Sequence, residues 1–177
     1  MPLVNGRILL DRIQEKRVLA GAFNTTNLET TISILNAIER SGLPNFIQIA
    51  PTNAQLSGYD YIYEIVKRHA DKMDVPVSLH LDQEDVKQAV RAGFTSVMID
   101  GAAFSFEENI AFTQEAVDFC KSYGVPVEAE LGAILGKEDD HVSEADCKTE
   151  PEKVKTFVER TGCDMLAVSI GNVHGLD

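Results

Sequence analysis

An α/β fold with a parallel sheet is the fold class that this sequence predicts. Short apolar or β-branched segments alternate with longer amphipathic segments along the whole chain. Glycine recurs where a predicted helix ends and the next strand follows, as expected at helix C-terminal caps. Strict alternation requires parallel strands joined by right-handed crossovers. It therefore predicts either an open doubly wound sheet or a (β/α)8 barrel, of which six βα units are visible.

The strands are expected where short apolar runs occur. Most of these runs are nearly continuous, which is typical of strands buried on both faces. In chain order the predicted strands are Val18–Phe23, Phe46–Ala50, Val75–Leu81, Thr95–Ile99, Val125–Leu131 and Met165–Ile170.

The helices are expected between these strands. The clearest is Glu107–Tyr123, in which Ile110, Val117 and Cys120 can share one face at helical spacing. The last predicted helix has a proline in its first turn and a glycine just after its end, which suits both termini. The others complete the alternation: Leu28–Ser41, Tyr61–Lys72, Glu84–Ala92 and Pro151–Thr161.

Composition predicts one soluble domain over residues 1–177. The chain has 44% apolar and 25% charged residues, and its net charge is −12. It shows no basic stripe with interleaved aromatics, so nucleic acid is not an expected partner. Its longest apolar runs fall far short of the ~20 residues that cross a bilayer, so no membrane association is expected. Three cysteines without C-x-x-C spacing favour neither a disulfide framework nor a cysteine zinc site, and the cytoplasm is the default compartment.

Polar side chains follow the predicted strands at their carboxyl ends, which form the functional edge in either architecture. His80 and Asp82 lie two residues apart and so share one face of a strand. They could meet at a site, or they could be a buried histidine and a helix-capping aspartate. Glu128 and Glu130 have the same spacing on an interior strand. Two carboxylates there are costly unless they bind a cation or hydrogen-bond donors, which favours a functional role.

Two later segments offer further candidates. His174 lies between Gly171 and Gly175 just past a predicted strand, where it could bind a metal or be a solvated loop residue. Glu138 begins an acidic run at 138–140. This run could be a solvated loop or a mobile carboxylate-bearing loop of an active site. The residues alone leave both alternatives open.

The ordered strand ends closely resemble those of one family. The segments are GAFN, HLD, SVMIDGAAFSFEENI, VPVEAELG and ERTGCDMLAVSIGNVHG, and the similarity extends from about Arg17 to Gly175. Together they resemble the metal-dependent class II fructose-/tagatose-bisphosphate aldolases. The resemblance implies a (β/α)8 TIM barrel, here incomplete, as one domain over 1–177 that lacks the last two βα units. It also implies a homo-oligomer, a dimer or a tetramer.

The resemblance implies a lyase of carbohydrate metabolism and glycolysis. Such an enzyme cleaves a ketose bisphosphate into dihydroxyacetone phosphate and glyceraldehyde 3-phosphate, and Zn²⁺ polarises the substrate oxygens. Matching motif positions imply the following roles: Asp82 and Glu138 as proton-transferring residues, Asn24, His80 and Gly175 near the phosphorylated sugar, and His174 and Glu130 as metal ligands.

This chain also departs from the family pattern. The family has a zinc-binding histidine and a short loop after H-x-D, whereas here Gln83 follows Asp82 directly. The family's remaining zinc histidine belongs to a later strand. Two alternatives to the aldolase therefore stand: a non-catalytic barrel remnant that binds a phosphorylated ligand or a partner subunit, and an open-sheet enzyme with metal-free chemistry.

Overall fold

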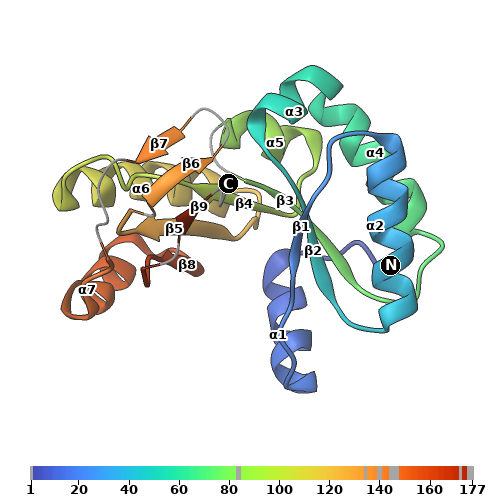
Figure 1. The fold of residues 1–177 in the computed structure, drawn as a ribbon, viewed down its shortest axis with the longest axis horizontal. Coiled ribbons are helices and arrows are strands. Elements are labelled where there is room, and N and C mark those ends of the chain that lie inside the picture. The colour runs from blue at the N-terminus through green and yellow to red at the C-terminus, as the bar shows by residue number, and fades with distance from the viewer. Residues whose placement is uncertain are drawn as a thin grey trace.

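A computed structural model describes residues 2–82, 85–133, 135–138, 141–143, 148–171 and 173–174. The segments 135–138, 141–143 and 173–174 are described by their backbone only. Its main sheet has six strands in the order β1-β2-β3-β4-β5-β8, all paired in parallel (Figure 1). The strands are β1 (Ala22–Asn24), β2 (Asn45–Ile49), β3 (Val77–Leu81), β4 (Ser96–Ile99), β5 (Val127–Leu131) and β8 (Met165–Val168).

The order of the strands decides between the two predicted architectures. Strands that follow one another in the chain also lie side by side in the sheet. A doubly wound sheet reverses its strand order at a switch point, whereas a barrel does not. The open-sheet alternative is therefore wrong, and the fold is an incomplete (β/α) barrel.

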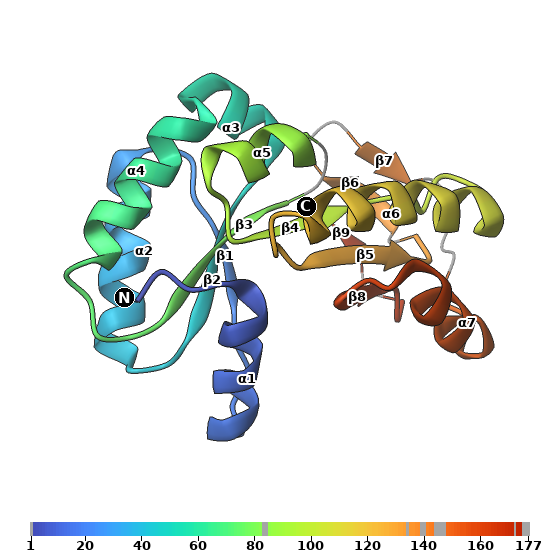
Figure 2. The ribbon, with the colours of Figure 1, turned by 180° about the vertical axis from the view of Figure 1, so that it is seen from behind.

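Helices cover the outer face of this sheet (Figures 1 and 2). Those between strands are α2 (Leu28–Ser41), α3 (Pro51–Ser57), α4 (Tyr59–Ala70), α5 (Val86–Ala92), α6 (Phe106–Lys121) and α7 (Pro151–Thr161). The bounds predicted for α2 and α7 are confirmed, and the ends of the other predicted helices differ from the observed ones by at most two residues. Helix α3 was not predicted. None of the described helices is both long and apolar enough to span a membrane.

The strands alternate between two kinds of face. All five residues of β3 are buried, as predicted, but only Val77, Leu79 and Leu81 join the apolar core between sheet and helices. Ser78 and His80 point to the opposite, inner face, because side chains of a strand alternate in direction. The continuous apolar run that was expected is therefore an apolar outer face with a polar inner one.

Helix α1 (Gly6–Lys16), which the sequence analysis missed, lies at the amino ends of the strands (Figure 2). Leu9 and Ile13 pack with Phe46 of β2, and Met165 of β8 borders the same cluster. Val18 packs there too, in the segment that returns from α1. For this reason β1 begins later than predicted, at Ala22.

Another unpredicted feature is a second, three-stranded sheet in the order β7-β6-β9. Its strands are β6 (Leu135–Glu138), β7 (His141–Ser143) and β9 (Val173–His174). Strand β6 pairs antiparallel with β7 and parallel with β9. This pairing brings two segments that are far apart in the sequence side by side.

A buried asparagine fastens α6 to β5. The side-chain amide of Asn109 donates to the backbone carbonyl of Glu130 at 2.9 Å, and its Oδ1 accepts from the Thr113 hydroxyl at 3.1 Å. Gly101 lies against the same side chain, since a Cβ there would be 2.3 Å from Asn109 Oδ1. The block Met98–Asn109 thus fixes the strand that carries Glu128 and Glu130.

Candidate active site

A row of polar side chains crosses the inner face of the sheet. The strand register pairs Asn24 with Gln48, Gln48 with His80, and His80 with Ser96. Paired residues of parallel strands point to the same face, so these four side chains share the inner face. Asp82 follows on that face immediately after β3.

His80 is the most deeply buried member of the row, with 3% of its surface exposed. Its Nδ1 lies 2.8 Å from the Ser96 hydroxyl oxygen, and its ring forms a T-shaped contact with the ring of Phe46. Burial lowers the pKa of His80 to about 4. The imidazole is therefore neutral near pH 7 and acts through hydrogen bonds.

Asp82 is half-buried and is held from strand β2. Its backbone N–H donates to the carbonyl of Ile49 at 3.1 Å. Its Oδ2 accepts from the side-chain amide of Gln48 at 2.8 Å. The carboxylate thus sits at the carboxyl end of β3, where barrel proteins place their chemistry.

Glu128 approaches the row from β5. Its Oε2 lies 3.7 Å from His80 Nε2. Burial and then the charge of Asp82 raise the pKa of Glu128 to about 7, while burial keeps His80 uncharged. The distance alone would suggest an ion pair, but the two pKa shifts indicate a contact between a neutral imidazole and a partly protonated carboxyl.

The two remaining described candidates lie at either side of this cluster. Glu130, which is 7% exposed, lies two residues beyond Glu128 and therefore on the same face of β5. Asn24 is exposed at the end of β1. The structure thus brings His80 and Asp82 together with Gln48 and Glu128, with Glu130 further along β5 and Asn24 at the end of the row.

Three predicted site residues fall partly or wholly outside the described residues. Glu138 lies in β6 and His174 in β9, and the Cα register pairs Gly136 with His174. Their backbone segments are therefore neighbours, although their side chains lie outside the described part of the chain. Gly175 lies outside it entirely.

Gln48 and Ser96 are the site residues that sequence reasoning missed. It examined residues at and after the strand ends, whereas both of these lie within strands. Their signal was the strand period of two, since Gln48 and Ser96 interrupt apolar runs at positions that face inward. Glu128 was recognised as one of a pair, but the family resemblance pointed only to Glu130.

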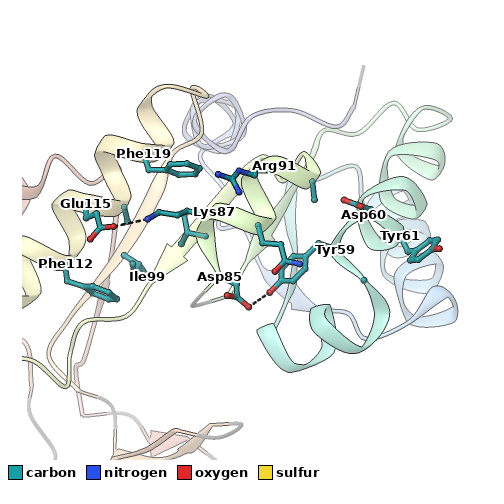
Figure 3. A pocket seen from close by; sticks show the side chains of 15 residues that line it. Tyr59, Asp60, Tyr61, Asp85, Lys87, Arg91, Ile99, Phe112, Glu115 and Phe119 are labelled. Carbon is teal, nitrogen blue, oxygen red and sulfur yellow. Dashed lines mark hydrogen bonds and ion pairs between the residues drawn. The ribbon is translucent and has the colours of Figure 1, made fainter.

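A separate cavity of about 1040 Å³ lies between α4, α5 and α6, on the outer side of the sheet (Figure 3). Two of its charged groups are bonded to neighbours in its wall. Lys87 Nζ is 3.0 Å from Glu115 Oε1, and the hydroxyl of Tyr59 is 3.1 Å from Asp85 Oδ2. None of the described candidate site residues lines this cavity, so its position does not support the predicted chemistry.

The fold is that of a (β/α) barrel protein, and the polar row forms a candidate site toward the carboxyl ends of its strands. The family model described as fructose-bisphosphate aldolase class-II matches residues 4–177. The chain therefore belongs to the class II fructose-bisphosphate aldolase family.

Individual relatives agree with this assignment. The chain is 40% identical over 182 residues to the "Probable fructose-bisphosphate aldolase" of Bacillus subtilis (strain 168), covering 99% of this chain and 64% of that protein. It is 39% identical to the fructose-bisphosphate aldolase of Staphylococcus aureus (strain Mu50 / ATCC 700699) over the same shares of both chains. The crystal structure of the YdjI aldolase from Escherichia coli K12 superposes with a TM-score of 0.84 at 35% identity, covering 99% of this chain and 63% of that one. The chain thus spans just under two thirds of the length of these relatives.

Proposed function

We propose that the chain supports the metal-dependent aldol cleavage of a ketose 1,6-bisphosphate to dihydroxyacetone phosphate and glyceraldehyde 3-phosphate, a lyase reaction of glycolysis. The observation that carries the proposal is the contact between Gln48 and Asp82 beside His80 and Glu128, at the carboxyl ends of the strands. It places a held carboxylate where barrel proteins bind their substrates. Family membership supports the reaction class.

Each candidate residue has a role in this proposal. Asp82 exchanges the proton on the oxygen derived from the aldehyde, and the neutral His80 contacts the substrate through hydrogen bonds. Glu138 takes the proton bound to carbon. Asn24 and Gly175 contact the phosphorylated sugar.

The inner face has the donor chemistry that a divalent cation requires. It carries the carboxyl groups of Asp82, Glu128 and Glu130, and burial and then the charge of Asp82 raise the pKa of Glu128. Among the described side chains, no three groups come close enough to hold a metal ion together. The family resemblance gives Glu130 and His174 as the proposed ligands, and their oxygen and nitrogen donors suit Zn²⁺. When bound, zinc supplies Lewis-acid polarisation of the substrate oxygens.

The remaining aspects of the proposal concern the molecule's context. A net charge of −12 disfavours nucleic acid or an anionic membrane surface as a partner. Family membership supports a phosphorylated sugar as the substrate. We place the protein in the cytoplasm as a homo-oligomer, either a dimer or a tetramer. Residues 1–177 form one barrel domain, which lacks two βα units of a complete barrel.

Two substitutions test the assignment of roles. Asp82→Ala should abolish the cleavage of fructose 1,6-bisphosphate and leave the zinc content unchanged, while His174→Ala should remove both. Cleavage is followed as dihydroxyacetone phosphate release, and zinc by elemental analysis after purification without chelator. The matched control is Asp118→Ala, an exposed carboxylate on α6 that should change neither. Cleavage retained by Asp82→Ala would contradict the roles.

Binding of a phosphorylated ligand without turnover is the second candidate. It is favoured by the fact that the described side chains do not assemble a three-ligand metal site. Calorimetric titration with dihydroxyacetone phosphate distinguishes the two. Binding by a chain that contains no zinc and cleaves no substrate supports the second candidate over the first.

A further inference from the structure

The carboxylate of Asp82 is held by a side chain from the neighbouring strand. Gln48 Nε2 donates to Asp82 Oδ2 at 2.8 Å. We infer that Gln48 is a positioning residue, which fixes the orientation of the Asp82 carboxylate for proton exchange with the substrate. This inference rests on the proposed function of Asp82, and it adds a residue that the sequence analysis did not single out.

Strand β2 holds Asp82 through two consecutive residues. Gln48 bonds its side chain, and the carbonyl of Ile49 accepts its backbone N–H at 3.1 Å. Gln48 is itself fixed, because its own carbonyl accepts the Thr25 N–H at 2.8 Å and its register pairs it with His80. Both ends of the contact are therefore mounted at strand ends within one sheet, which suits a group that must hold its geometry.

The chemistry of an amide gives this contact a direction. An amide N–H can donate to a carboxylate oxygen but cannot accept a proton from a carboxyl group. Gln48 therefore favours the ionised form of Asp82 and directs the exchanged proton to Oδ1. The described titratable groups that face Asp82 are His80, which is neutral, and Glu128, whose negative charge would oppose ionisation.

A substitution that removes only the donor tests this role. Gln48→Met keeps the length of the side chain and removes the N–H donor without adding a charge. Gln48→Glu keeps the shape of the side chain but replaces the donor by a second carboxyl group beside Asp82. We expect kcat for cleavage to fall about tenfold or more, the scale of a lost hydrogen bond to a charged group, with KM within about twofold. We also expect the midpoint of the Asp82 carboxyl titration, followed by ¹³C NMR, to move to higher pH.

The chain contains a matched control for this experiment. Gln55 Nε2 donates to Asp85 Oδ2, also at 2.8 Å, in an exposed pair that is not part of the proposed site. Gln55→Met should leave kcat, KM and the Asp82 midpoint unchanged. A general effect of losing a glutamine–aspartate contact would appear in both variants.

The outcomes separate this inference from the proposed function. If the unmodified chain cleaves no substrate but Gln48→Met still moves the Asp82 midpoint, the proposed aldol cleavage is wrong. The contact between Gln48 and Asp82 is then confirmed, but it has no catalytic role. If the unmodified chain is active and both Gln48 variants keep its kcat and midpoint, the inference is wrong. If the variants do not fold, the unmodified chain decides, because the Gln48 side-chain amide resonance should shift as Asp82 titrates. An amide resonance that stays constant overturns the inference.

Discussion

Burial and a negatively charged neighbour both raise the pKa of a carboxyl group, and Glu128 experiences both effects. Burial is the larger cause and the charge of Asp82 the smaller one. The neutral imidazole of His80, whose pKa is lowered by burial, provides no compensating positive charge. The inner face is therefore a place where negative charge is expensive, which suits the binding of a cation or the transfer of a proton.

The raised pKa of Glu128 makes stability depend on pH. The folded chain holds this proton more tightly than the unfolded chain, whose carboxyl has the ordinary value of 4.5. The contribution to stability is therefore fully present below about pH 4.5 and is lost as pH rises through about 7. Glu128→Gln removes this loss, so between about pH 4.5 and 8 its free energy of unfolding should rise by about 3 kcal/mol relative to that of the wild type. Urea unfolding with a chelator present measures it, and parallel pH curves would contradict it.

At the scale of elements, the contact between helix α6 and strand β5 holds the strand that carries Glu128 and Glu130 in place. Helix α6 does not only cover the sheet, because Asn109 reaches across to the backbone of β5 at Glu130. The turn at Gly101 leaves room for that side chain. The family motif in this block is thus explained by packing as well as by chemistry.

The Gly101 turn gives a prediction that involves two sites. Gly101→Ala places a Cβ 2.3 Å from Asn109 Oδ1 and should destabilise the fold by about 1–3 kcal/mol through overpacking. Asn109→Ala should cost about 1–3 kcal/mol, because it leaves the carbonyl of Glu130 without its side-chain donor. The double variant should lose less stability than the sum of the two single losses, because the Cβ at position 101 no longer meets Asn109 Oδ1. Chemical denaturation of all four proteins measures the coupling, and simple additivity would contradict the packing.

The sequence predicted these elements to different degrees. Helices α2 and α7 were predicted with their bounds because periodicity and terminal signals agreed. Helix α3 was missed because it begins at Pro51, one residue after β2 ends, so no loop in the sequence separates it from the strand. The small sheet was missed because its strands are short and pair with distant partners, so no local period reveals them. His80 and Asp82 could be found from spacing, whereas Gln48 became visible only once β2 and β3 were paired.

At the scale of the whole molecule, the incomplete barrel has two unlike ends. The carboxyl ends of the strands carry the polar row, while α1 packs its apolar side chains against the amino ends. Arg7 of α1 also pairs with Asp164, which precedes β8. Helix α1 thus connects β2 with the start of β8, the last strand of the main sheet.

Helix α1 should accordingly contribute to global stability. Leu9 is fully buried in the cluster with Ile13 and Phe46, so Leu9→Ala should cost about 2–5 kcal/mol of unfolding free energy. The control is the neighbouring Ile8, which is 49% exposed and whose change to Ala should cost far less. Thermal and urea unfolding compare the two variants. Equal costs would show that α1 does not seal this end of the sheet.

The alternation of apolar and polar residues along β3 also protects the sheet against pairing of this strand in a wrong register. If β3 slid by one position against its neighbours, His80 would enter the apolar layer between sheet and helices, and Leu79 and Leu81 would face the inner side of the sheet. Such a slipped sheet would forfeit several kcal/mol of transfer energy, so it could not persist as a competing folded form. The inward-facing polar residues of β3 therefore also help to fix the register of this strand, on which the candidate site depends.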